Sequence, residues 1–120
     1  MPLWFEDTTA LLGRVLVGGF FLWTGILNAM NFPETAAVFG ALQLPYPIAL
    51  AILVVAIQVC AGVALVVGVR VRVASLVLAA FLLIMTPILH NAFGDPQQLP
   101  LFLQNLALVG ALLYIAAIEK

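Results

Sequence analysis

Residues 47–89 decide the fold, and they read PIALAILVVAIQVCAGVALVVGVRVRVASLVLAAFLLIMTPIL. They form two long apolar runs, residues 47–68 and 73–89, separated by four residues that include Arg70 and Arg72. With 22 and 17 residues, both runs are close to the roughly 20 apolar residues that a helix needs to cross a bilayer. Because lipid cannot satisfy free backbone amides, such runs cross as helices. The short link therefore predicts a tight antiparallel hairpin of two transmembrane helices.

Two further apolar runs, residues 11–30 and 101–118, qualify as spans. The chain has 120 residues, of which 66% are hydrophobic and 8% charged. Soluble domains average about 45–50% apolar and about 25% charged residues, and a soluble chain this short could not bury so much apolar surface. The sequence predicts an all-α, polytopic membrane protein. We expect an antiparallel bundle of four transmembrane helices that forms a single domain over residues 1–120.

The linkers between the spans differ in length. Residues 31–46 contain Pro33, Gly40 and Pro45, and we predict a short interfacial helix over residues 34–42, with Pro33 in its first turn. Residues 91–100 hold Gly, Asp, Pro and Gln side chains and are typical of a loop. Glu34 and Asp95, the acidic residues of these linkers, are expected to be solvated.

The positive charges predict an orientation. With an even number of spans, all four cations fall on one side of the membrane: Arg14, Arg70, Arg72 and Lys120. The opposite linkers contain Glu34 and Asp95 but no Lys or Arg. Since cytoplasmic loops carry the excess of Lys and Arg, both termini are predicted to be cytoplasmic.

Small residues indicate where helices pack closely. The second span carries a stripe at intervals of four, and the first span carries two glycines seven apart. We predict that these residues pack against other helices: Gly18, Gly25, Ala56, Cys60, Ala64 and Gly68. Two uses of the second-span stripe stay open, namely packing within the chain and formation of a homodimer.

Polar residues inside a membrane are costly, so each needs a partner or a purpose. Five are candidate ligand-binding residues: Arg14, Asn28, Gln58, His90 and Asn105. Arg14 is either a snorkelling anchor or a guanidinium that holds an anionic or carbonyl ligand. Gln58 either bridges helices or hydrogen-bonds a ligand carbonyl. His90 is either an interfacial or core residue or a group that exchanges protons with the outer compartment.

Three of these residues are predicted to lie at a similar depth in the membrane. Asn28, His90 and Asn105 all lie near the outer ends of their spans. If they face inward, they form one polar layer below the outer loops.

Several kinds of chemistry are excluded. The single His and the single Cys provide no metal or haem ligand set and no disulfide within one chain. A net charge of −1 and the lack of any nucleic-acid motif exclude nucleic acid as a partner.

The order of polar residues resembles the DoxX family of small four-helix membrane proteins over almost the whole chain. The resemblance rests on these blocks: 13–15 GRV, 21–25 FLWTG, 42–47 LQLPYP, 58–62 QVCAG, 68–72 GVRVR, 90–93 HNAF and 104–110 QNLALVG. Two positions depart from the family pattern, which often has an acidic residue at Gln58 and a lysine at Gln104. The loss of both charges weakens any role that needs charge at these places.

The resemblance implies a prokaryotic protein of the cytoplasmic (inner) membrane. The name-giving members of the family look like subunits of a thiosulfate:quinone oxidoreductase, and others accompany quinone-detoxification or oxidative-stress systems. One interpretation is a redox-associated subunit that binds a quinone or a similar lipophilic molecule. Because the chain has no electron carrier of its own, it would belong to a quinone-linked oxidoreductase complex with a membrane or redox partner protein.

The other interpretation is a non-enzymatic membrane protein. It would bind a lipid or small solute, form a transport component or act as an assembly factor. The short connections favour a module whose partners act from within the bilayer. Both interpretations stay open, since a fold of this kind does not specify a function.

Overall fold

The computed structural model describes residues 3–89 and 96–118, and all regular structure in them is helical. Four helices are long and apolar enough to cross a membrane. They are α1 (Leu3–Met30), α3 (Pro47–Val67), α4 (Val71–Leu89) and α5 (Leu99–Ile118). The predicted all-α bundle of four antiparallel membrane helices is confirmed, and the protein is a multi-pass membrane protein.

Helix α1 begins at Leu3, well before the predicted span that starts at residue 11. The added turns contain Glu6, Asp7, Thr8 and Thr9. Hydropathy marks the part of a helix that lies in lipid, whereas the helix itself continues wherever its backbone hydrogen bonds continue. The difference is therefore one of helix length and leaves the number of spans unchanged.

A short helix, α2 (Phe32–Ala41), lies between the first two spans, where the sequence predicts one. Pro33 occupies its first turn, where the missing backbone N–H costs nothing. Phe39 of α2 is 2% exposed and packs with Ala51 and Val54 of α3. This contact holds α2 against one end of the bundle. A one-turn 3₁₀ helix, η1 (Pro96–Gln98), precedes α5.

The turn between α3 and α4 is as tight as predicted. Gly68 ends α3 in the left-handed region (φ 94°), which a side chain would disfavour. The N–H groups of Gly68 and Val69 both donate to the carbonyl of Ala64, at 2.8 and 3.0 Å. These bonds satisfy the end of α3 and reverse the chain immediately.

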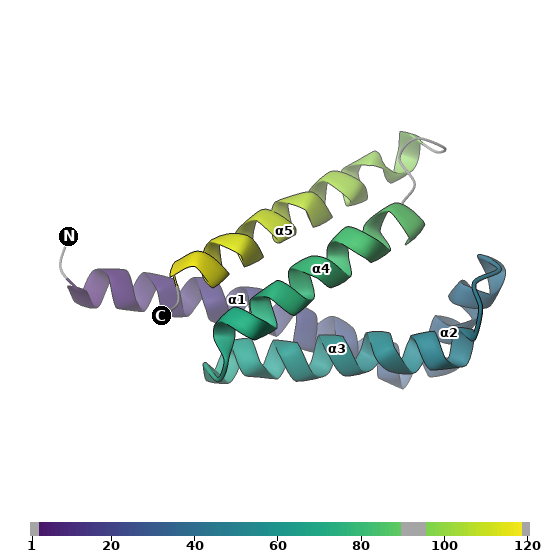
Figure 1. Cartoon of the computed structure of the whole chain (residues 1–120), viewed down its shortest axis with the longest axis horizontal. Helices are drawn as coiled ribbons and strands as arrows, with labels where there is room; N and C mark the ends of the chain where they lie inside the picture. Colours follow the sequence, from purple (N-terminus) through teal and green to yellow (C-terminus); the bar gives the residue numbers. More distant parts are fainter. Residues whose placement is uncertain (1–2, 90–95, 119–120) are drawn as a thin grey trace.

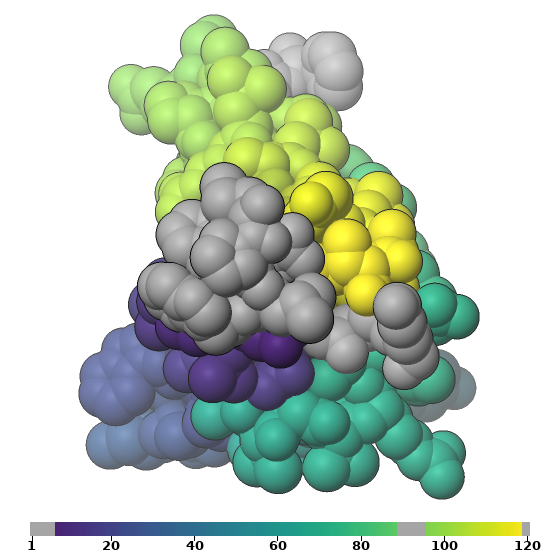
Figure 2. Space-filling view, turned by 90° about the vertical axis from the view of Figure 1, so that its left-hand side faces the viewer, coloured from purple at the N-terminus to yellow at the C-terminus, as the bar shows by residue number. Residues whose placement is uncertain are grey.

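The helices form two pairs, α1 with α3 and α4 with α5, and α4 and α5 run obliquely across the first pair (Figure 1). The core between the pairs is apolar, and four large side chains in it are less than 2% exposed: Phe21, Leu65, Leu78 and Leu112. Figure 2 views one end of the bundle, where the purple part of α1, the α3–α4 turn and the yellow last turns of α5 gather. The other end carries α2.

Glycines bring α1 and α3 into close contact. A Cβ added to Gly18 would lie 2.9 Å from the carbonyl oxygen of Gly62, and one added to Gly62 would lie 2.7 Å from the backbone nitrogen of Leu22. A Cβ on Gly25 would meet the Gln58 Cβ at 2.9 Å. Backbone therefore touches backbone along this seam, as in other membrane helix pairs built on small residues.

Candidate functional site

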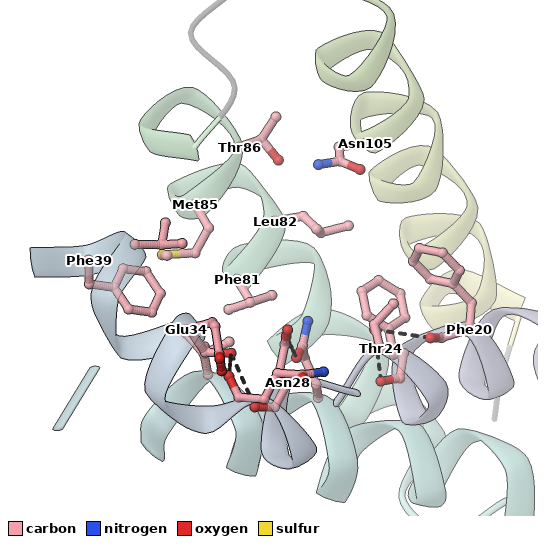
Figure 3. A pocket seen from close by; sticks show the side chains of 16 residues that line it. Phe20, Thr24, Asn28, Glu34, Phe39, Phe81, Leu82, Met85, Thr86 and Asn105 are labelled. Carbon is pink, nitrogen blue, oxygen red and sulfur yellow. Dashed lines mark hydrogen bonds between the residues drawn. The ribbon is translucent and has the colours of Figure 1, made fainter. Parts of the chain in front are cut away.

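A cavity of about 430 Å³ lies toward the α2 end of the bundle and is lined by side chains from all five α-helices (Figure 3). Most of its lining is apolar, with Phe20 and Phe21 from α1, Phe39 from α2 and Phe81 from α4. A size of a few hundred Å³ and a mainly apolar wall with a few polar groups are typical of small-molecule sites.

The arrangement of the helices explains where the cavity lies. Glycines close the α1–α3 seam, so the space cannot form there. Helix α1 contacts α5 over a much shorter stretch than it contacts α3. The cavity occupies the region between the two pairs, and α2 covers part of it with Glu34, Thr35, Val38 and Phe39.

An amide pair forms the polar floor of the cavity. Asn28 of α1 donates from Nδ2 to Oε1 of Gln58 on α3, at 2.8 Å. Gln58 is only 9% exposed. Each side-chain amide has two donor hydrogens and an acceptor oxygen, so this bond leaves the Gln58 NH₂ group and the Asn28 oxygen available. The pair joins the two helices and also presents both a donor and an acceptor to a ligand.

A hydroxyl group attaches α2 to the end of α1. Oγ1 of Thr35 lies 3.1 Å from the carbonyl oxygen of Asn28 and 3.0 Å from that of Asn31. The Asn31 carbonyl also accepts the backbone N–H of Thr35, at 3.0 Å, so both the backbone and the side chain of Thr35 bond to the end of α1. The contact fixes the position of α2 over the cavity.

A second polar group lies on the opposite wall. Thr86 of α4 is 3% exposed, and its Oγ1 has no hydrogen-bond partner among the described residues. In the view of Figure 3, Thr86 and Asn105 of α5 point toward one another across the cavity. An unpartnered buried hydroxyl is costly and unusual. A ligand oxygen or a water molecule in the cavity would satisfy it.

The structure brings together three of the five candidate ligand-binding residues. Asn28, Gln58 and Asn105 all line the cavity. His90 lies outside the described residues, so the predicted polar layer is present here only through its two asparagines. Arg14 does not line the cavity, and the ligand roles of all five residues stay predictions.

Arg14 lies at the other end of the bundle. Its Nη2 is 3.1 Å from the place where a Cβ on Gly68 would be, so the glycine leaves room for the guanidinium beside the end of α3. Arg72 lies at the same end and donates from Nε to the carbonyl of Ala116, at 3.2 Å. This bond ties the start of α4 to the last turn of α5.

Sequence reasoning missed several residues of the site. Glu34 was expected to be a solvated loop acid, and it is exposed but also lines the cavity. Thr86 was not proposed as a ligand-binding residue, although a hydroxyl in an apolar span, followed directly by Pro87, was the available signal. The aromatic lining carried no such signal, because phenylalanines are common throughout the spans.

The candidate packing residues have different positions. Gly18 and Gly25 lie in the α1–α3 seam, together with Gly62, which was not predicted. Ala64 is partly buried against the core, whereas Ala56 and Cys60 are exposed. Steps of four residues advance about 40° beyond a full turn each time, so such a stripe winds around the helix. A packing role for Ala56 and Cys60 between molecules stays a prediction.

The cavity can hold a ligand but offers little chemistry of its own. Its polar groups are amides and hydroxyls, and the carboxylate is that of Glu34. Among the described residues, no three metal-ligating side chains come together. Such a lining is typical of sites that bind mostly apolar molecules through a few hydrogen bonds.

One comparison with known proteins gives a match. The model of the DoxX family matches residues 9–91, well over half of the chain. No curated protein and no solved structure matches it. The matched region includes most of α1, the whole of α2, α3 and α4, and every cavity-lining residue except Asn105. By this match, the chain belongs to the DoxX family.

Proposed function

We propose that the protein binds a quinone, or a similar lipophilic molecule with carbonyl oxygens, in the cavity between its helix pairs. The observation that carries this proposal is the buried Thr86 hydroxyl, which has no hydrogen-bond partner among the described residues and lines a cavity of ligand size. A quinone has an oxygen at each end of a flat ring. The Thr86 hydroxyl of α4, the Asn105 amide of α5 and the Gln58 amide on the floor provide donors for these oxygens.

The aromatic residues support a ring-shaped ligand. Phe20 and Phe21 are in edge-to-face contact, with ring centroids 5.3 Å apart, and both line the cavity. Phe39 and Phe81 add further aromatic surface from α2 and α4. Aromatic side chains favour stacked or edge-to-face contacts with another ring.

A redox role follows only in combination with a partner. The described residues carry no metal-ligand group and no redox-active cysteine pair. The proposed function is therefore a redox-associated subunit of a quinone-linked oxidoreductase complex, in which a partner protein supplies the electrons. The chain's own residues would bind and orient the quinone.

The second candidate function is non-enzymatic binding of a lipid or small solute, as in a transport component or assembly factor. The observation that favours it is the amide character of Gln58 and Gln104, two positions where the family often has ionisable groups. A site without these charges has fewer means of moving protons. The rate of quinone reduction in membranes that contain the protein, compared with the rate in membranes that lack it, separates the two functions.

The same proposal includes an orientation in the bacterial cytoplasmic membrane, with both termini in the cytoplasm. It is supported by the location of Arg14 and Arg72 at one end of the bundle and of Glu34 at the other. In a Cys60→Ala background, Asp95→Cys should react with an impermeant thiol reagent in intact cells, and Arg70→Cys should not. The reverse labelling pattern would contradict the orientation.

Ligand binding is tested by removing the unpartnered hydroxyl. Thr86→Val keeps the shape of the side chain but loses the donor. We expect the affinity for decyl-ubiquinone in nanodiscs to fall about three- to tenfold. The stability should be unchanged or higher, because no described hydrogen bond is lost.

Ser75→Ala is the matched control. Ser75 also lies on α4, is fully buried and has an unpartnered hydroxyl among the described residues, but it lines no described cavity. The Ser75→Ala substitution should leave the affinity for decyl-ubiquinone unchanged. Equal affinities for the wild type and both variants would count against a quinone at this site.

A further inference from the structure

A second hollow lies on the outside of the bundle, between α1 and α5. It has a volume of about 370 Å³ and is lined by Leu16, Val17 and Phe20 from α1 and by Gln104, Ala107 and Leu108 from α5. We refer to this hollow as the α1–α5 groove. Five of its six side chains are apolar. Leu16 is 72% exposed, so the groove is open to the surface that the bilayer covers.

The groove and the cavity share one residue. Phe20 lines both of them, and it is 41% exposed, whereas its neighbour Phe21 is 1% exposed. Figure 3 shows Phe20 at the side of the cavity where α1 passes α5. Phe20 therefore forms the wall between a buried polar site and a lipid-facing apolar groove.

The order of residues gives the groove a direction. Phe20 and Gln104 are adjacent in sequence to the cavity residues Phe21 and Asn105, and Leu16 lies one turn further along α1. From Asn28 to Leu16, α1 extends about 18 Å at its usual rise per residue. Leu16 lies near the middle of the apolar span Asp7–Met30. The groove thus leads from the cavity toward the middle of the bilayer.

We propose that the α1–α5 groove holds the apolar tail of the molecule whose polar ring occupies the cavity, and that the ligand reaches the cavity sideways from the bilayer past Phe20. This inference rests on the proposed function and adds a ligand class to it: a quinone with a long hydrocarbon tail rather than a water-soluble one. A linear hydrocarbon fits the groove because its walls are apolar and continuous with the cavity through one side chain.

The geometry also separates the roles of the two sites. The cavity has the hydrogen-bonding groups that recognise a ring with oxygens, while the groove has a single amide, that of Gln104, at the end nearer the cavity. The affinity for the tail should therefore depend on the groove's shape, and the affinity for the ring should depend on the cavity's polar groups.

The test measures two probes with the same ring, decyl-ubiquinone and the tail-less dimethoxymethylbenzoquinone. The full chain is placed in nanodiscs, and binding to empty nanodiscs is subtracted to remove partition into lipid. Ala107→Trp fills the groove from α5. Ala117→Trp is the matched control, since Ala117 is an exposed alanine of the same helix outside both hollows.

We expect the wild type to bind the decyl probe at least tenfold more tightly than the tail-less probe. Ala107→Trp should abolish this preference by weakening only the decyl probe, and Ala117→Trp should preserve it. Should Ala107→Trp fail to fold, Leu16→Trp narrows the groove from α1 and should have the same effect.

Three outcomes would overturn or redirect the inference. If Ala107→Trp keeps the preference for the tail, the tail lies elsewhere and the inference is wrong. If Ala107→Trp removes only co-purified phospholipid, the groove belongs to a lipid acyl chain and the inference is again wrong. If the wild type binds neither probe, it is the proposed function that fails.

Discussion

Helix α1 meets its two neighbours in opposite ways. Against α3 it brings glycines together, so that a Cβ on Gly18 would collide with Gly62. Against α5 it presents larger side chains, among them Leu16 and Phe20, and the two helices enclose a groove. Helix α1 thus forms a close-packed contact with α3, which we call the solid seam, and a looser contact with α5, which we call the open seam.

The difference shows how a short apolar chain makes a ligand site. In lipid, packing contributes more to helix association than the hydrophobic effect does. Small residues on one face of α1 therefore determine which neighbour approaches closely. The space that remains falls between the helix pairs, where Asn28, Gln58, Thr86 and Asn105 place polar groups.

The largest expected effect on stability comes from adding a side chain at a glycine of the solid seam. An added Cβ on Gly18 would lie 2.7 Å from the Leu65 Cβ and 2.9 Å from the Gly62 oxygen, neither of which can move freely. Gly18→Ala should lower the free energy of unfolding by about 2–3 kcal/mol, as other overpacked cores do. Denaturation in mixed detergent micelles measures this.

The neighbouring glycine is a close control. A Cβ on Gly19 would meet nothing within 4 Å. Gly19→Ala should leave the stability unchanged or raise it by up to about 1 kcal/mol through helix propensity. Equal losses for the two variants would show that the seam is not where the glycines place it.

An intermediate effect is expected at the amide pair, where the solid seam meets the cavity. Gln58→Leu removes the 2.8 Å bond from Asn28 and leaves that amide without its acceptor. We expect a loss of about 1 kcal/mol in stability, within the range for hydrogen bonds between membrane helices. The affinity for the decyl probe should fall about tenfold.

Gln104→Leu serves as the stability control for that substitution. Gln104 is exposed and is not part of the amide pair, so its replacement should change the free energy of unfolding by less than about 0.5 kcal/mol. A larger loss for Gln104→Leu than for Gln58→Leu would contradict the structural role of the pair.

The smallest effect concerns the end of the bundle far from the cavity. Arg72→Gln loses the 3.2 Å bond from Nε to the Ala116 carbonyl, which holds α4 to α5. We expect a loss of about 0.5–1 kcal/mol and no change in affinity for the decyl probe. A clear loss of affinity would mean that the open seam depends on how α4 and α5 are joined at this end.

The sequence predicts the spans well because hydropathy and helix length are local properties. Residues 47–68 and 73–89 correspond closely to α3 and α4, and the left-handed Gly68 makes the turn between them. Helix α1 begins before the predicted span at residues 11–30, because its first turns are helical but polar.

The candidate site is only partly predictable. Asn28, Gln58 and Asn105 were found because a polar residue within an apolar span stands out. Their partners could not be found in this way, because the contact of Asn28 with Gln58 depends on which faces of α1 and α3 meet. That choice depends on Gly62, whose role becomes clear only when both helices are in place.

The most direct test of the quinone site is native mass spectrometry of the gently purified protein, with extraction and identification of the molecules it carries. The account predicts about one quinone per chain in the wild type and in Ser75→Ala, and a clearly lower quinone content in Thr86→Val and Gln58→Leu. Protein that carries only phospholipid, or that keeps its quinone in all four forms, would contradict a quinone site between the helix pairs.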